Sequence, residues 1–405
     1  MLVISPDEAW RRIDARLAPL PEERLARRAA LGRVLARPLA AASDVPAADV
    51  SAMDGYAVGG AVEPGERRPV AATIAAGDPP GIVLPAGAAA RIMTGAPLPA
   101  GADRVVPVEA TDGGRREVAF RAAAAAGEHI RRRGEVLRAG QPLLAAGTPL
   151  TPGVLSLLAG HGYAELPVHR APSVAVLATG DEVVPPETDP APGQLRDSHT
   201  DFLLAEGAGL GLAFASLGIA PDHPGALAER VRAGLLADVL LLCGGVSMGE
   251  FDLVEGVLAE AGCELHFDAV AIQPGKPLVF ATHPGGLIFG LPGNPASVMV
   301  GFWLFVRPAL RRLLGHRDGW WQGACAAILA APLPGAGARD RFLPARPSDI
   351  ELAGGLPRVV PLASVGSHDL AAYARGAALV RVPAGSPPAP AGAPCEILPL
   401  AGWRA

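Results

Sequence analysis

Three polar segments in the middle of the chain each follow a short apolar run. They are Thr-Gly-Asp-Glu at 179–182, Gly-Gly-Val-Ser-Met-Gly-Glu-Phe-Asp at 244–252 and Leu-Pro-Gly-Asn-Pro at 291–295. Paired glycines let backbone N–H groups approach an anion, and the N-terminus of a following helix favours negative charge. Carboxylates beside such a site are typical Mg²⁺ ligands. The segments predict a site for an oxyanion and a divalent cation, although Asp252 alone could equally be a helix N-cap.

Lys276 is the single lysine among 35 basic residues, and all the others are arginine. It lies in Pro-Gly-Lys-Pro at 274–277, where two prolines and a glycine fix the loop. A codon bias towards arginine explains the rarity of lysine but not its retention here, because a compact ammonium and a planar guanidinium bind differently. A solvated surface lysine is the ordinary interpretation, and the composition favours a functional one.

The elements that position these segments alternate between strand and helix over residues 172–317, which indicates a doubly wound parallel sheet with helices on both faces. Ligands bind beyond the carboxyl ends of such strands, so the three segments should share one edge of the sheet. We expect strands at 173–178, 213–219, 239–243 and 287–290. We expect helices at 201–208, 224–236, 253–261 and 296–314.

The flanking regions carry other patterns. Ser5 and Thr151 each precede a proline and predict capped helices, and a further helix is expected over 22–36. Residues 41–138 consist of short apolar runs broken by glycine and proline, which is typical of a β-rich module. Residues 318–405 have short strands and many prolines and should form a small β domain.

Composition excludes several classes of protein. The formal net charge of −5 over 405 residues argues against a nucleic-acid-binding surface. The four cysteines lack C-x-x-C spacing, so a disulfide framework or thiolate zinc site is not expected and a reduced, cytoplasmic setting fits. The N-terminus shows no secretory signal pattern. The most apolar run, 296–306, is about half the length that spans a bilayer and predicts a buried helix instead.

Six strings together closely resemble those of the molybdopterin molybdenumtransferase family, which includes bacterial MoeA and the E domain of gephyrin. In chain order they are SAMDGYA from Ser51, MTGAPLPAGAD from Met93, ATGDE from Ala178, GGVSMGEFD from Gly244, PGKP from Pro274 and LPGNPASV from Leu291. They occur in family order and cover nearly the whole chain.

The resemblance implies that the protein inserts molybdate into adenylylated molybdopterin and releases AMP and molybdenum cofactor, with Mg²⁺ or another divalent cation. Sulfur ligands for molybdenum would come from the dithiolene of the pterin, so the protein need only position and polarise. The resemblance also implies an elongated homodimer with the site between the α/β domain of one subunit and the inserted module of the other. Its four domains would be a discontinuous scaffold at 1–40 and 139–171, an inserted module at 41–138, the α/β domain at 172–317 and a barrel-like domain at 318–405.

The resemblance also implies roles for individual residues. Four carboxylates would hold the metal or help to break the phosphoanhydride: Asp54, Glu182, Asp222 and Asp252. Thr94 matches a hydroxyl position of the site, and Lys276 and Ser297 would contact molybdate. The other residues expected to bind substrate are Gly244, Gly245, Ser247, Gly249, Pro292, Gly293, Asn294, Pro295, Arg339 and Ser367.

Some positions depart from the family pattern. Val136 replaces a usual carboxylate, Gln273 and Ala269 stand where members often carry lysine, and His199 replaces asparagine in an Asp-Ser-Asn string. The site would carry less positive charge than the family pattern. A reduced affinity for molybdate, or a role as a specialised paralogue, therefore stays open.

Two alternative functions also stay open. Val136 and Gln273 would suit a non-catalytic molybdopterin carrier or scaffold, and the α/β domain resembles molybdopterin adenylyltransferases. Against the latter, the strings from Ser51 and Met93 belong to the insertion branch. Expected partners are the pterin substrate and, transiently, other cofactor-synthesis proteins, with no nucleic acid or membrane.

Overall fold

The structure is a computed structural model that describes residues 3–245, 253–348, 355–400 and 403. Contacts along the chain divide it into two compact units, which we describe separately. The first comprises Met1–Arg24, Gly32–Ala36 and Pro167–Ala405, and the second comprises Leu25–Leu31 and Arg37–Leu166. The finer four-domain division stays a prediction.

A six-stranded sheet forms the centre of the first unit, with the strand order β15-β12-β16-β20-β19-β17. The first four strands are parallel, as predicted. Each of the four expected strands lies within about one residue of an observed one. The last two were not predicted: β19 is antiparallel to both of its neighbours, and β17 pairs with β19 at the edge of the sheet. The strands are β12 (Val174–Thr179), β15 (Phe214–Ala220), β16 (Val239–Cys243), β17 (Glu264–Ala269), β19 (Pro277–His283) and β20 (Gly286–Leu291).

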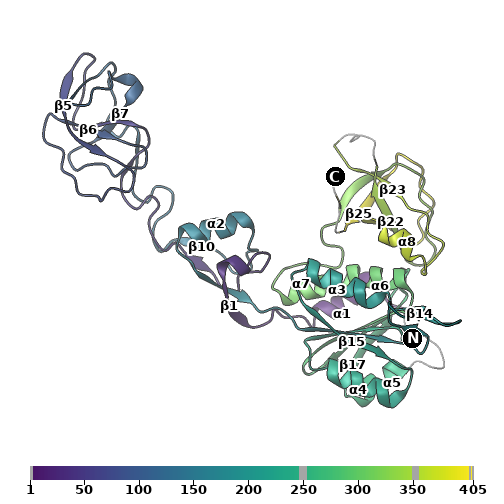
Figure 1. Cartoon of the computed structure of the whole chain (residues 1–405). Helices are drawn as coiled ribbons and strands as arrows, with labels where there is room; N and C mark the ends of the chain where they lie inside the picture. Colours follow the sequence, from purple (N-terminus) through teal and green to yellow (C-terminus); the bar gives the residue numbers. More distant parts are fainter. Residues whose placement is uncertain (1–2, 246–252, 349–354, 401–402, 404–405) are drawn as a thin grey trace. The chain divides into compact units, whose positions relative to one another are not determined.

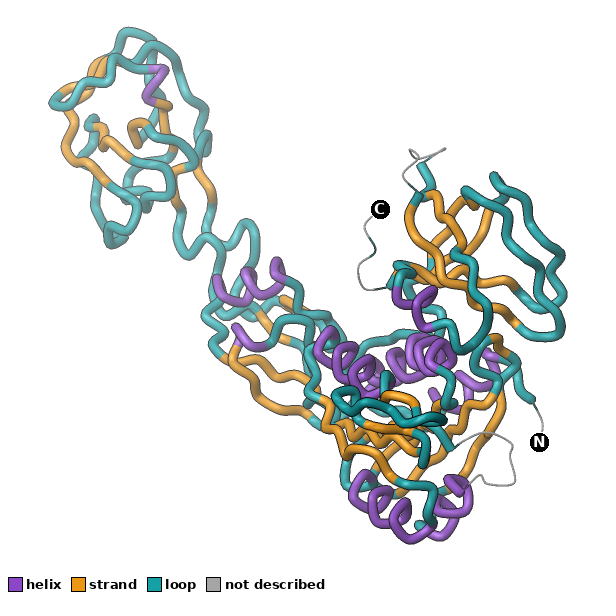
Figure 2. The backbone as a smooth tube through the Cα atoms, turned by 45° about the vertical axis from the view of Figure 1, so that its right-hand side comes forward, coloured by secondary structure: helices purple, strands orange, loops and turns teal. Residues whose placement is uncertain are grey.

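Helices cover both faces of this sheet, which confirms the doubly wound arrangement (Figures 1 and 2). One face packs against α4 (Pro224–Gly234) and α5 (Leu253–Glu260). The opposite face packs against α1 (Pro6–Asp14), α3 (His199–Gly209), α6 (Pro295–Gly301) and α7 (Arg307–Leu313). Helix α1 is capped as expected, since the Ser5 hydroxyl accepts a hydrogen bond from the Glu8 N–H at 3.1 Å.

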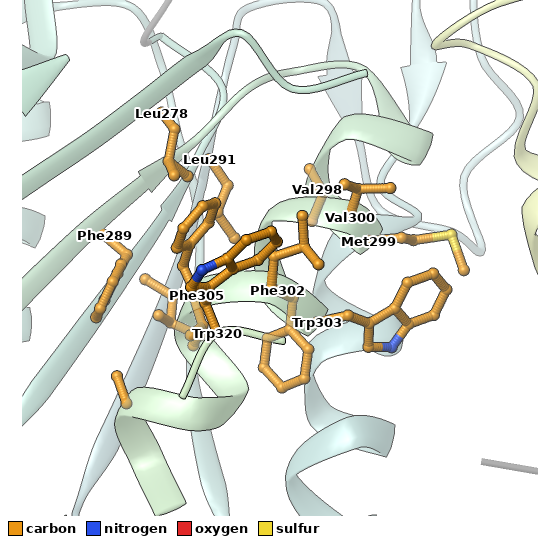
Figure 3. Packing of buried hydrophobic residues seen from close by; sticks show 14 of the residues in the cluster. Leu278, Phe289, Leu291, Val298, Met299, Val300, Phe302, Trp303, Phe305 and Trp320 are labelled. Carbon is orange, nitrogen blue, oxygen red and sulfur yellow. The ribbon is translucent and has the colours of Figure 1, made fainter. Parts of the chain in front are cut away.

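The expected helix over 296–314 is present but interrupted. A π-helical segment, η3 (Phe302–Val306), joins α6 to α7, and nothing in the hydrophobic periodicity indicates it. Every side chain from Ala296 to Val306 is buried (Figure 3). The Phe305 ring stacks on Trp320 with centroids 6.4 Å apart. Within the described ranges, no helix is long and apolar enough to cross a membrane.

The prediction of a helix over residues 22–36 is wrong. Strand β1 (Glu22–Ala26) and the 3₁₀ turn η1 (Arg27–Ala29) occupy its first half. Strand β1 pairs with β11 (Glu165–His169), and its alternating burial has the period of a strand. Further backbone bonds join Arg27 N–H to Ala164 C=O and Ala36 N–H to Pro167 C=O, so pairing overrides the helical propensity of this arginine- and alanine-rich run.

The second unit is β-rich, as predicted. Its five-stranded sheet has the order β7-β4-β6-β5-β8, and two apolar clusters pack against it. The sheet consists of β4 (Gly55–Val58), β5 (Arg67–Ile74), β6 (Ala89–Ile92), β7 (Arg104–Pro107) and β8 (Glu117–Ala119). Its other elements are β2 (Leu39–Ala40), β3 (Val50–Ser51), η2 (Val108–Ala110), β9 (Ile130–Arg131), β10 (Pro142–Leu144) and the expected helix α2 (Pro152–Gly160).

Near the C-terminus, five strands close into a barrel in the order β22-β23-β21-β25-β24, completed by pairing of β24 with β22. This confirms the predicted barrel-like fold. The short strand β18 (Ile272–Gln273) adds to β22 in parallel. The barrel elements are β21 (Cys325–Leu329), β22 (Asp340–Pro347), β23 (Arg358–Pro361), α8 (Leu370–Ala374), β24 (Ala378–Val382) and β25 (Pro394–Pro399), and a separate pair is β13 (Val183–Val184) with β14 (Leu195–Arg196).

A hydrogen-bonded ion pair holds the amino ends of β12 and β16 together. Arg170 donates to both oxygens of Asp238 at 2.7 and 2.6 Å, and the N–H and hydroxyl of Ser173 donate at 2.8 and 2.7 Å. The bonds from Arg170 are the main reason that the pKa of Asp238 lies well below its usual range. The carboxylate therefore stabilises the fold above its unfolded pKa of about 3.9, and that stabilisation is lost as pH falls towards the lower folded pKa.

We predict that Asp238→Asn lowers the free energy of unfolding at pH 7 by about 1.5–3 kcal/mol, because charge-assisted bonds are replaced by neutral ones. The difference from wild type should shrink as the pH falls below about 3.9. Urea unfolding across this pH range measures it. Asp189→Asn is the control, because the Asp189 side chain is fully exposed beside Arg196. A loss for Asp238→Asn that does not depend on pH would contradict the charge argument.

Candidate functional site

The carboxyl ends of β12, β16 and β20 lie side by side, as the sequence predicted. The Thr179 hydroxyl donates to the Cys243 carbonyl at 3.5 Å, and the Gly244 N–H donates to the Leu291 carbonyl at 3.0 Å. The loops that begin at 179, 244 and 291 therefore start from one edge of the sheet.

The paired glycines after β16 are required by packing. Gly244 and Gly245 have φ of +94° and +64°, which side chains rarely adopt. A Cβ on Gly244 would lie 2.6 Å from the Thr179 carbonyl oxygen, and one on Gly245 would lie 2.9 Å from Val254. This close approach explains the glycines without a ligand, so their anion-binding role stays a prediction. Residues 246–252 lie outside the described residues, and with them the candidates Ser247, Gly249 and Asp252.

Lys276 lies on a fixed loop between β18 and β19. Gly275 has φ +99°, and a Cβ there would lie 3.2 Å from Ile272 and 3.5 Å from the Ser297 carbonyl oxygen. The Lys276 carbonyl accepts a hydrogen bond from the Val270 N–H at 2.9 Å. Lys276 is half-buried, and no ion pair of its ammonium group occurs among the described residues. Its charge is thus not balanced by a carboxylate of the described residues.

A cavity of about 530 Å³ gathers most of the predicted residues of the first unit. Ser297, only 3% exposed, lies on its wall, and the Ala296 N–H donates to the Ser367 carbonyl at 3.0 Å, which holds the loop of Ser367 against α6. The predicted residues on the wall are Glu182, Lys276, Pro292, Gly293, Asn294, Ser297, Arg339 and Ser367. This volume suits a small organic ligand. Gly244, Gly245, Pro295 and Asp222 are not on this wall.

A second cavity of similar volume has the opposite charge. Four carboxylates lie on its wall, from Asp181, Glu187, Asp197 and Asp201, and no basic side chain does. The first cavity has Lys276 with arginine side chains and one carboxylate. The positive charge therefore lies on the wall of the first cavity and not of the second.

Three carboxylates, those of Asp181, Glu182 and Asp222, lie near one another, and of these Asp181 lines the second cavity and Glu182 the first. The Asp222 N–H donates to Asp181 at 3.0 Å, and the Glu182 carboxylate lies over Gly180, where a Cβ would be 2.6 Å from its oxygen. Burial raises the pKa of Asp222, and the negative charges of Asp181 and Glu182 raise it further. Yet among the described residues, no group of three or more His, Cys, Asp or Glu side chains has metal-binding geometry. The metal site stays a prediction.

Asp54 and Thr94 meet in the second unit. Asp54 accepts hydrogen bonds from the Thr94 N–H at 2.7 Å and the Thr94 hydroxyl at 2.8 Å. The bond from the Thr94 N–H, followed by the bond from its hydroxyl, lowers the pKa of the exposed Asp54 carboxyl. Backbone bonds from Ser51 N–H to Ala96 C=O and from Gly95 N–H to Ser51 C=O join the two loops. The two motifs therefore build one local polar site.

Sequence reasoning missed several residues of the first cavity. Arg341, Ser364 and Tyr373 lie on its wall, together with Gln273. No sequence signal indicated Arg341, because Arg339 precedes the first residue of β22, and alternation along the strand does not relate the two. Of the positions that depart from the family pattern, Ala269 is buried in β17 and Val136 is 72% exposed in the second unit.

The fold and the first cavity define a multidomain α/β protein whose cavity is lined by cationic and hydroxyl side chains, and comparison with known proteins assigns its family. Three family models match: the MoeA N-terminal region (domain I and II) over residues 4–162, a probable molybdopterin binding domain over 175–312 and the MoeA C-terminal region (domain IV) over 326–400. The chain belongs to the molybdopterin molybdenumtransferase family.

Individual relatives agree with this assignment. The molybdopterin molybdenumtransferase of Nostoc sp. is 40% identical over 303 residues, which cover 72% of this chain and 69% of the relative. That of Bacillus subtilis is 35% identical, covering 84% of this chain and 81% of the relative. A crystal structure of a molybdopterin biosynthesis MoeA protein from Pyrococcus horikosii superposes with a TM-score of 0.83 at 30% identity, covering 99% of this chain and all of the other.

Proposed function

We propose that the protein inserts molybdate into adenylylated molybdopterin and releases AMP and molybdenum cofactor. One observation carries the proposal beyond family membership: Lys276, Arg339 and Ser297 line the same cavity as Glu182 at the carboxyl edge of the sheet. Positive charge and a buried hydroxyl suit a tetrahedral oxyanion, and the adjacent carboxylates suit a cation that accompanies a phosphate.

The side chains of the cavity would bind and orient the substrates. Lys276 donates to a molybdate oxygen, and the nearly buried Ser297 hydroxyl donates a second bond. Arg339 is held by a bond from its guanidinium to the Ile272 carbonyl at 3.3 Å and adds positive charge. Pro292 is buried and shapes the floor of the cavity. The dithiolene of the pterin supplies the sulfur ligands for molybdenum, so the protein contributes position and polarisation.

The proposed function includes Mg²⁺ near Glu182 and Asp222, with Asp252 and Asp54 as further candidate ligands. The donor set fits, because these groups are carboxylates and Mg²⁺ prefers oxygen. The raised pKa of Asp222 also reflects repulsion from Asp181 and Glu182 that a cation would relieve. When bound, the cation would draw charge from the phosphoanhydride.

We further propose a homodimer in the cytoplasm, in which Asp54 and Thr94 complete the site of the partner subunit, and transient contact with other cofactor-synthesis proteins. The family resemblance supports this proposal. Sedimentation equilibrium should give twice the chain mass of 41.1 kDa. A monomer mass at micromolar concentration would contradict the homodimer.

The test of the function is release of AMP from adenylylated molybdopterin by purified protein with Mg²⁺. We expect release of AMP that depends on molybdate. Parallel reactions with tungstate establish which of the two oxyanions the protein prefers. Bound pterin without AMP release would contradict the enzyme and favour a carrier. Formation of adenylylated molybdopterin from ATP, without molybdate-dependent release, would favour an adenylyltransferase.

A further inference from the structure

Arg341 lies on the wall of the same cavity as Lys276 and Arg339. It is the register partner of Gln273, because β18 runs parallel to β22 with Ile272 opposite Asp340 and Gln273 opposite Arg341. Register partners project from the same face of a sheet, and Gln273 also lines the cavity. Sheet register therefore directs Arg341 towards the cavity.

The nearest carboxylate in the sequence does not neutralise Arg341. Asp340 lies on the opposite face of β22, where it accepts bonds from Arg381 at 2.9 Å and from the Ala384 N–H at 2.9 Å. Among the described residues, the Arg341 guanidinium donates one long hydrogen bond of 3.5 Å, to the Gly335 carbonyl. Within the described part of the chain, no carboxylate forms an ion pair with Arg341. The positive charge of its guanidinium is therefore not balanced by any carboxylate of the described residues.

The charge on the cavity wall supports a role for this guanidinium. Three cations, Lys276, Arg339 and Arg341, face one carboxylate, Glu182. This leaves two positive charges for a dianion, whereas the wall without Arg341 would leave one. A dianion removed from water needs such compensation, because an unpaired charge in a partly buried site is unfavourable. Ser297, which is 3% exposed, adds a hydroxyl group to the same wall.

We propose that Arg341 is a third cationic contact for the tetrahedral oxyanion bound in this cavity. Its planar fork can donate two bonds to neighbouring oxygens, which the Lys276 ammonium does less well. The identity of the oxyanion rests on the proposed function: molybdate itself, or the phosphate of adenylylated molybdopterin.

Equilibrium dialysis of the full chain with molybdate and, separately, with AMP tests this role without turnover. Arg341→Gln should weaken binding of one probe about tenfold, as expected for the loss of one charge-assisted contact. Weaker binding of molybdate alone identifies molybdate as the ligand, and weaker binding of AMP alone identifies the phosphate. Arg341→Lys should recover part of the loss. Arg375→Gln is the matched control, because Arg375 is exposed beside Tyr373 and is absent from the cavity wall.

Binding of both probes within twofold of wild type in Arg341→Gln would overturn the proposal. A failure of wild-type protein to release AMP would overturn the proposed function but not this result, because dialysis does not need catalysis. If Arg341→Gln does not fold, modification of wild-type arginines by phenylglyoxal, followed by peptide mass spectrometry, replaces it. Molybdate or AMP should protect Arg341 and leave Arg375 unprotected, and equal labelling of Arg341 with and without both probes would overturn the proposal.

Discussion

Lys276→Ala will reduce the molybdate-dependent kcat/KM for AMP release about 100-fold, because loss of one positioned donor to a charged group has roughly this effect. The Lys276 ammonium has no ion-pair partner among the described residues, so its removal leaves none of their carboxylates without a partner. Its loop is fixed by Gly275 and by the bond from Val270 N–H, both independent of the side chain. The melting temperature should therefore change little.

Initial rates over a range of molybdate concentrations measure this effect, and thermal unfolding measures the melting temperature. Lys276→Arg keeps the charge in a wider, planar form and should recover only part of the activity. Arg317→Ala is the control, since Arg317 is an exposed cation that is absent from the cavity wall. Activity of Lys276→Ala equal to wild type would refute its role, and an equal loss in the control would point to a general effect of charge.

The parallel core could be predicted because its strands are long apolar runs that end at glycine-rich or polar segments. Strand β17 could not, because it carries the polar residues Glu264, His266 and Asp268 among the apolar ones. Strand β19 is an apolar run that the strand and helix alternation of the sequence did not include. The helix expected over 22–36 failed for a related reason. Its spacing suits a helix, but the decisive backbone bonds come from 163–168, more than a hundred residues away.

The candidate site divides in the same way. Lys276 was predictable from composition, since one lysine among arginines is visible in any reading of the chain. Arg341 was not, because it is one arginine among many and only its register with Gln273 turns it towards the cavity. The meeting of Asp54 with Thr94 likewise depends on backbone bonds between two distant loops. Long-range pairing, rather than local pattern, decides which polar groups share a site.

Phe305→Ala will lower the free energy of unfolding by about 3–5 kcal/mol, the usual result of emptying a fully buried aromatic site. Phe305 lies in the π-helical segment η3, has no exposed surface and stacks on Trp320 (Figure 3). The truncated side chain leaves space that Trp320 and its neighbours can fill only in part. Urea unfolding followed by far-UV circular dichroism measures the loss.

Phe305→Leu should lose less than the alanine variant, because more of the volume is kept. Leu236→Ala is the control, since Leu236 is 90% exposed and should change stability by no more than about 0.5 kcal/mol. A loss below about 1 kcal/mol for Phe305→Ala would contradict the packing shown here. The helix that begins at Pro295 carries Ser297 in its first turn and continues through η3, so the apolar contacts of Phe305 hold the segment that presents the Ser297 hydroxyl. Molybdate binding by the folded alanine variant then shows whether that anchor sets only stability or also the position of the hydroxyl.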